Sequence, residues 1–124
     1  MTREEMKART KTYANRIVKL CEALLGGWVA RTLGGQLRRS GTSVGANYRA
    51  VGRAKSTADF LNKLRIVEEE CDESLCWMEL LVENNLVKGA RLKSLMQAGD
   101  ELLSLVVASA KTTRASSSFV NRKS

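Results

Sequence analysis

Apolar and small side chains recur with alternating steps of four and three along residues 60–81. The series runs Phe60, Leu64, Val67, Cys71, Ser74, Met78 and Leu81. Positions three and four apart share one face of an α-helix, so this heptad spacing predicts a long helix that packs against other helices along one seam. The Ser-Thr-Ala-Asp sequence at residues 56–59 is typical of a helix N-cap, and Asn84-Asn85 is typical of an end. We therefore expect a helix from about Ser56 to Asn84.

Three further segments carry apolar residues on one helical face. They cover residues 3–25, residues 28–54 and the stretch that follows Gly89. Gly26-Gly27 separates the first two segments, and the chain contains no proline that would interrupt any of them. Four amphipathic helices joined by short connections bury their apolar faces most economically against one another. The sequence therefore predicts an all-α fold, an antiparallel up-and-down four-helix bundle.

The chain of 124 residues has the size of one domain. Residues 112–124 are basic, rich in serine and without apolar periodicity. We expect the four-helix bundle to occupy residues 1–111 and residues 112–124 to form a flexible tail.

Several residue types needed for catalysis are missing. Histidine, the commonest general base and metal ligand, does not occur, and the three cysteines form no Cys-x-x-Cys pair. Residues 41–45 match the Gly-x-Ser-x-Gly motif of hydrolases, but that motif requires a turn between strand and helix and a histidine. We predict a protein that is not an enzyme and uses no cofactor and no metal.

The sequence contains no run of 18 apolar residues, and residues 1–11 are charged where a signal peptide would be apolar. We expect a protein of the cytoplasm without a membrane partner.

Charge is distributed unevenly along the chain, whose net charge is +8. Residues 1–55 carry twelve basic and three acidic side chains, residues 56–110 carry five and ten, and residues 111–124 carry four and none. A localised positive field attracts polyanions.

Five arginines of the second predicted helix lie on one stripe opposite its apolar face. This arginine stripe consists of Arg31, Arg38, Arg39, Arg49 and Arg53. Together with Lys7 and Lys11, it is our predicted binding surface for RNA, and also for DNA, through phosphate contacts. The alternative is that the stripe pairs with acidic residues of the third predicted helix, within one chain or between subunits, in a protein-protein scaffold that binds no nucleic acid.

Two other features indicate contacts between subunits. A glycine line, Gly34, Gly41, Gly45 and Gly52, favours close approach of another helix. An outer patch on the third predicted helix consists of Ile66, Trp77 and Leu80; such a patch usually marks association, and the alternative is that the tryptophan is buried against a neighbouring helix. We predict an oligomer interface at Gly41, Gly45, Ile66, Trp77 and Leu80.

The series Gln-Leu-Arg-Arg-Ser-x-Thr-Ser-Val-x-Ala-Asn at residues 36–47, followed by Arg53, Phe60, Leu64 and the stretch from Glu69 to Leu75, resembles the family related to 23S rRNA intervening-sequence proteins. The resemblance covers about residues 10–108. The family pattern continues with Ala-Glu-Gly after the asparagine, where this chain has Tyr-Arg-Ala-Val-Gly at residues 48–52. An arginine thus replaces an acid, and no role of that glutamate carries over.

The resemblance implies an up-and-down bundle that assembles as a homopentamer and lacks catalytic activity. The chain is also similar in length, charge and helix pattern to the accessory variability protein (Avd) of diversity-generating retroelements, a basic pentamer that binds a reverse transcriptase and nucleic acid. That similarity implies an RNA-binding accessory function with a reverse transcriptase as partner. The signature at residues 36–47 does not separate these two groups.

Overall fold

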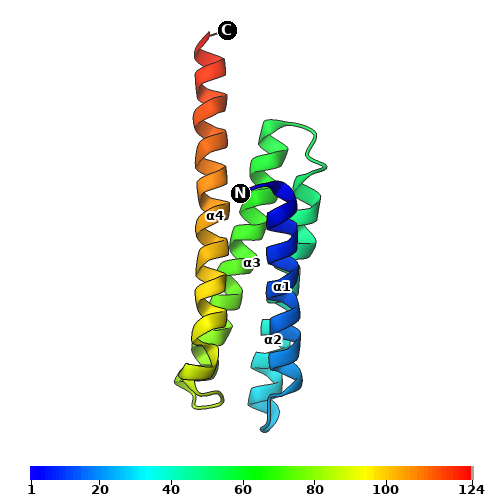
Figure 1. Cartoon of the computed structure of the whole chain (residues 1–124), viewed down its shortest axis with the longest axis vertical. Helices are drawn as coiled ribbons and strands as arrows, with labels where there is room; N and C mark the ends of the chain where they lie inside the picture. Colours follow the sequence, from blue (N-terminus) through cyan, green and yellow to red (C-terminus); the bar gives the residue numbers. More distant parts are fainter. Residues whose placement is uncertain (124) are drawn as a thin grey trace.

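The computed structural model describes the backbone of residues 1–123 and the side chains of residues 1–117. Its helices are α1 (Arg3–Glu22), α2 (Trp28–Val51), α3 (Thr57–Glu83) and α4 (Gly89–Lys123). Each helix runs antiparallel to the next along the chain, and consecutive helices pack together most extensively (Figure 1). Helices α1 and α4 close the ring through a smaller contact. The predicted all-α fold with antiparallel neighbouring helices is confirmed.

Side-chain caps fix the starts of two helices. Thr2 and Glu5 form a capping box at α1, and the Ser56 hydroxyl accepts a hydrogen bond from the Asp59 amide at α3. Hydrogen bonds from Lys63 and from the Lys55 amide hold the pKa of Asp59 below its usual value. The predicted start of the third helix is confirmed. Helix α1 ends at Glu22, three residues earlier than expected, and Gly26 takes the turn's positive φ of 139°.

The heptad seam of α3 lies in the centre of the bundle. All its members from Leu64 to Leu81 are buried, and Phe60 at its start is partly buried. The one hydroxyl on the seam, Ser74, has a buried partner, because its Oγ and the Tyr13 Oη lie 2.8 Å apart in a hydrogen bond. Burial raises the pKa of Tyr13 well above its usual value. The seam therefore combines apolar packing with one satisfied polar contact between α1 and α3.

The glycine line of α2 faces α1 of the same chain. A Cβ at Gly41 would meet Ile17, and a Cβ at Gly45 would lie 3.3 Å from the Thr10 Oγ1. Gly41 is buried in this contact. The expected close helix approach is present, but it occurs within the chain. Gly41 and Gly45 therefore pack against α1, and their assignment to a subunit interface stays a prediction.

Helix α4 extends beyond the other helices at the end of the bundle that holds the N-terminus (Figure 1). Residues 112–123, which we expected to lack regular structure, have helical backbone, whereas the flexibility of this segment stays a prediction. No glycine or proline occurs there to end the helix. Continuing a formed helix adds one hydrogen bond for each residue fixed, so α4 propagates past its last packing partner.

Candidate nucleic-acid interface

Helix α2 contains no acidic residue, and the sequence has none between Glu22 and Asp59. All five members of the arginine stripe are exposed. Among the side chains of residues 1–117, four of these arginines form no ion pair, namely Arg31, Arg38, Arg49 and Arg53. Guanidinium groups that lack a partner in the chain are free to bind phosphate oxygens.

Arg39 differs from the rest of the stripe because it turns toward α3. Its guanidinium lies 3.2 Å from a carboxylate oxygen of Glu70 and also pairs with Glu73. The hydrogen bond that Arg39 donates to Glu73, followed by the charges of both carboxylates, raises the pKa of Arg39. The structure thus divides the predicted stripe into four arginines without an ion pair and one that links α2 to α3.

The two lysines of the predicted surface lie on α1, the neighbour of α2. Lys7 pairs with Glu4 at 3.3 Å, whereas Lys11 is exposed and forms no ion pair among the described residues. Lys11 follows Thr10, which touches the backbone of α2 at Gly45. Lys11 is therefore the unpaired lysine of the two, while Lys7 is partly neutralised.

A small pocket opens between the end of α1 and the first half of α2. Its volume is about 210 Å³, and Arg31 and Arg38 are among its lining residues. The Cys21 thiol lies in its wall and donates a hydrogen bond to the Gly34 carbonyl at 3.3 Å. Burial raises the pKa of Cys21, and the charge of Arg38 opposes that shift. Two cationic side chains and apolar residues such as Leu24 and Ala30 therefore line the pocket.

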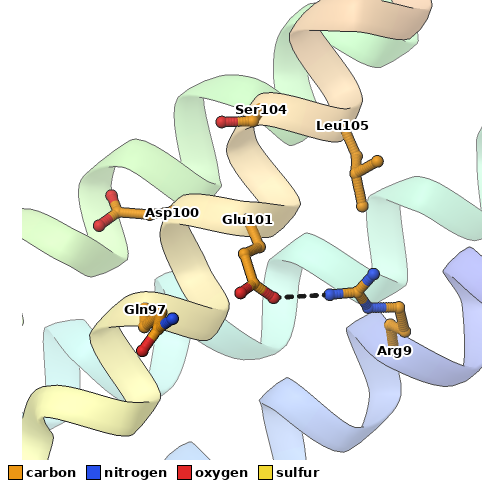
Figure 2. Close-up of a pocket in the computed structure, with 6 residues that line it drawn as sticks. All are labelled: Arg9, Gln97, Asp100, Glu101, Ser104 and Leu105. Atoms are coloured by element: carbon orange, nitrogen blue, oxygen red, sulfur yellow. Dashed lines mark hydrogen bonds and ion pairs between the residues drawn. The ribbon is translucent and has the colours of Figure 1, made fainter.

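A second hollow, between α1 and α4, has mixed charge. It is lined by Arg9, Gln97, Asp100, Glu101, Ser104 and Leu105. Figure 2 shows the Glu101 carboxylate pointing toward the guanidinium of Arg9, and the two groups form an ion pair at 2.9 Å. Because two carboxylates line this hollow, it is a poorer site for a polyanion than the surface of α2.

The outer patch of α3 is half-buried rather than open. The Trp77 indole N–H donates a hydrogen bond to Glu73 at 3.2 Å, and the ring packs against the core. Ile66 and Leu80 have intermediate exposure. The assignment of Ile66, Trp77 and Leu80 to a subunit interface stays a prediction.

Three exposed apolar residues at the start of α2 were not part of the predicted surface. Leu25, Trp28 and Val29, here called the turn patch, lie in the α1–α2 turn and in the first turn of α2. The signal in the sequence is the placement of large apolar residues on either side of Gly26-Gly27, where a turn is expected to be polar.

Within the part of the chain that the structure describes, no group of three or more Cys, Asp or Glu side chains converges as metal ligands would. No described helix combines the length and the apolarity that crossing a bilayer requires.

Residues 4–108 match the family model of the 23S rRNA-intervening sequence protein. The chain belongs to this family. The crystal structure of a protein of unknown function from the S23 ribosomal protein family of Bacteroides thetaiotaomicron is similar, with a TM-score of 0.82 and 33% sequence identity. The similarity covers 90% of this chain and 99% of that one. No curated protein matches the chain.

The family signature at residues 36–47 combines packing residues with exposed ones. Leu37 and Val44 are fully buried, and the Ser40 hydroxyl donates to the Gln36 carbonyl at 3.0 Å. Arg38 and Arg39 of the signature are exposed.

Proposed function

We propose that this protein is a non-enzymatic, oligomeric RNA-binding accessory protein of the cytoplasm. The observation that carries the proposal is a set of four exposed arginines that lack ion pairs among the described residues, three on α2 and Arg53 in the turn after it, within a stretch of sequence that contains no acid. The phosphates of RNA supply the negative charge that this surface lacks. DNA phosphates offer the same chemistry, and binding to DNA is part of the proposal.

Assembly of several copies would enlarge this surface. The family resemblance implies a homopentamer, and a ring of copies would repeat the α2 surface around its axis. The resemblance to accessory variability proteins leads us to propose a reverse transcriptase as the protein partner. A reverse transcriptase gene and a template repeat beside the gene for this chain would support that partner, and a neighbourhood without them would contradict it.

The test of RNA binding compares two triple variants that remove equal charge. R38Q/R49Q/R53Q removes three arginines that form no ion pair, in α2 and the turn after it, and K88Q/K93Q/K111Q removes three exposed lysines in α4 and the turn before it. We expect the first variant to lose most affinity for a structured RNA in fluorescence anisotropy and the second to keep it. Equal affinity of both variants, with helical content unchanged by circular dichroism, would refute binding at this surface.

A second function is favoured by the pairing of Arg39 with Glu70 and Glu73. This contact demonstrates that an α2 arginine and α3 carboxylates can meet, so the other arginines could pair with α3 of an adjacent subunit. The protein would then be a scaffold without a nucleic-acid role. In that case R38Q/R49Q/R53Q would dissociate the oligomer in light scattering, whereas our proposal expects the same mass as the unsubstituted protein.

A further inference from the structure

Exposed apolar side chains gather at one end of the bundle. Within residues 1–117, the turn patch accounts for all the large exposed apolar side chains apart from Met1. Leu25 is 87% exposed, Trp28 is 71% exposed and Val29 is 42% exposed. The α1–α2 turn that carries them lies at the lower end of the bundle in Figure 1. A tryptophan left this open, with apolar neighbours, is typical of an interaction site.

A pocket of about 210 Å³ lies near this patch. Leu24, Gly26 and Ala30 line it, and a Cβ at Gly35 would meet nothing within 4 Å. The lining residues Gly26, Ala30 and Arg31 adjoin the turn patch in sequence. Arg31 therefore links the helical turn that carries the exposed indole to the wall of the pocket.

Helical geometry places cations next to the tryptophan. Arg31 follows Trp28 by three residues, so the two side chains are neighbours on adjacent turns of α2. Arg38 lies seven residues beyond Arg31, about 10 Å along the helix axis. Both arginines are exposed and form no ion pair among the described residues. An aromatic side chain followed by two free cations is the combination by which proteins hold single-stranded nucleic acid.

We infer that Trp28 is a stacking platform for an unpaired base of single-stranded RNA, with Arg31 and Arg38 binding phosphates of the same strand. This inference rests on the proposed RNA-binding function and specifies its substrate as a strand with accessible base faces. In an RNA duplex those faces are covered by neighbouring base pairs, so the indole has nothing to stack on.

Charge favours a nucleic acid over an apolar protein partner at this patch. Arg31 and Arg38 are the only charged residues that line the pocket. The sequence offers no acid between Glu22 and Asp59 to neutralise them. A protein partner without acidic residues would bury these cations unpaired, which is costly, whereas a strand of RNA supplies an apolar base face and phosphates together.

The test uses the fluorescence of Trp28. The variant W77F leaves Trp28 as the sole tryptophan of the full chain. This protein is titrated with a single-stranded uridine oligomer of about 12 nucleotides and, separately at the same salt, with an RNA hairpin whose strands are fully paired and joined by a non-nucleotide linker, so that it has no unpaired base. We expect the single strand to quench the emission and the hairpin to leave it nearly unchanged.

Three further variants separate stacking from general apolar contact. W28A should weaken binding of the single strand by about tenfold or more, and its hairpin affinity should stay within about twofold. W28F should recover part of the loss because it restores an aromatic face. L25A removes an even more exposed apolar side chain that has no ring, and it should bind the single strand as the parent does.

Several results would overturn the inference. Binding of the hairpin alone, or W28A weakening both RNAs equally, would leave the proposed RNA-binding function intact and remove Trp28 from it. A Trp28 emission that changes with protein concentration without RNA would assign the patch to a second copy of the chain. If neither RNA binds at the lowest salt, the proposed function and this inference both fail.

Discussion

Arg38 and Arg39 are adjacent in the sequence but have different surroundings in the fold. Arg39 contacts Glu70 and Glu73 of α3, whereas Arg38 lines the pocket beside Cys21 of α1 and has no carboxylate partner among the described residues. Consecutive residues on a helix are about 100° apart, which is enough to direct these two side chains toward different neighbouring helices. Separate predictions therefore follow for the substitution of Arg38 and of Arg39.

Replacing Arg38 by glutamine should weaken RNA binding about three- to tenfold at moderate salt, since one phosphate contact is lost. R39Q is the matched control, because the same charge is removed from a side chain that α3 already neutralises. We expect R39Q to change RNA affinity by less than about twofold. Fluorescence anisotropy with one RNA measures the affinity of both variants. Equal losses of affinity would show that Arg39 binds RNA despite its ion pairs with α3.

The three cysteines should react with iodoacetamide in the order of their exposure and thiolate content. Cys76 is exposed, Cys21 is half-buried with a raised pKa, and burial raises the pKa of Cys71 to about 12. The thiolate is the reactive form. At pH 8 we expect mass spectrometry to find Cys76 modified first, Cys21 later and Cys71 only after unfolding. Early modification of Cys71 would contradict the described core.

The same burial predicts a pH dependence of stability. The folded state keeps the Cys71 thiol neutral up to a pKa of about 12, whereas an unfolded chain ionises it near pH 8.5. This contribution to stability is complete below about pH 8.5 and is lost as the pH rises toward 12. The variant C71A should therefore show a weaker loss of stability over this alkaline range.

At the scale of the helices, Gly99 sets how closely α4 approaches its neighbours. A Cβ at Gly99 would lie 2.7 Å from the Tyr13 Oη and 2.8 Å from the Leu75 Cδ2. The Gly99 carbonyl also accepts a hydrogen bond from the Cys71 thiol at 3.3 Å. Tyr13 of α1 and Leu75 of α3 therefore pack against α4 at Gly99, where α4 carries no side chain.

The substitution G99A should destabilise the protein by about 1 to 3 kcal/mol, because the added methyl group overpacks the contact with Tyr13 and Leu75. Gly35 provides the control, since it lies inside α2 and a Cβ there would meet nothing within 4 Å. G35A should stabilise by about 0.5 to 1 kcal/mol through helix propensity. Urea unfolding measures both, and a G99A protein as stable as the parent would contradict the close packing.

The sequence predicts elements well where a local signal is strong. The cap at Ser56 and the seam from Leu64 to Leu81 follow from spacing alone, and both are confirmed. The helical backbone of residues 112–123 was missed because propagation from a packed helix needs no periodicity of its own. The glycine line predicted a close helix approach, but the spacing alone could not identify α1 as the helix that packs there.

At the scale of the whole molecule, charge is separated between helices. Helices α1 and α2 carry an excess of basic residues, and α3 carries most of the acids. Helical periodicity in the sequence predicted the arginine stripe, and all five of its arginines are exposed. The sequence could not show that Arg39 pairs with α3 or that the turn patch is exposed, since these depend on how neighbouring helices are arranged.

The most direct measurement is the salt dependence of RNA affinity, by fluorescence anisotropy from about 50 to 300 mM salt. We expect log K to fall steeply with log salt, and R38Q/R49Q/R53Q to reduce that slope by about two to three units, since each lost phosphate contact removes 0.7 to 0.9. K88Q/K93Q/K111Q should keep the full slope. No RNA binding at 50 mM salt, or the same slope for both variants, would contradict a phosphate-binding surface on α2.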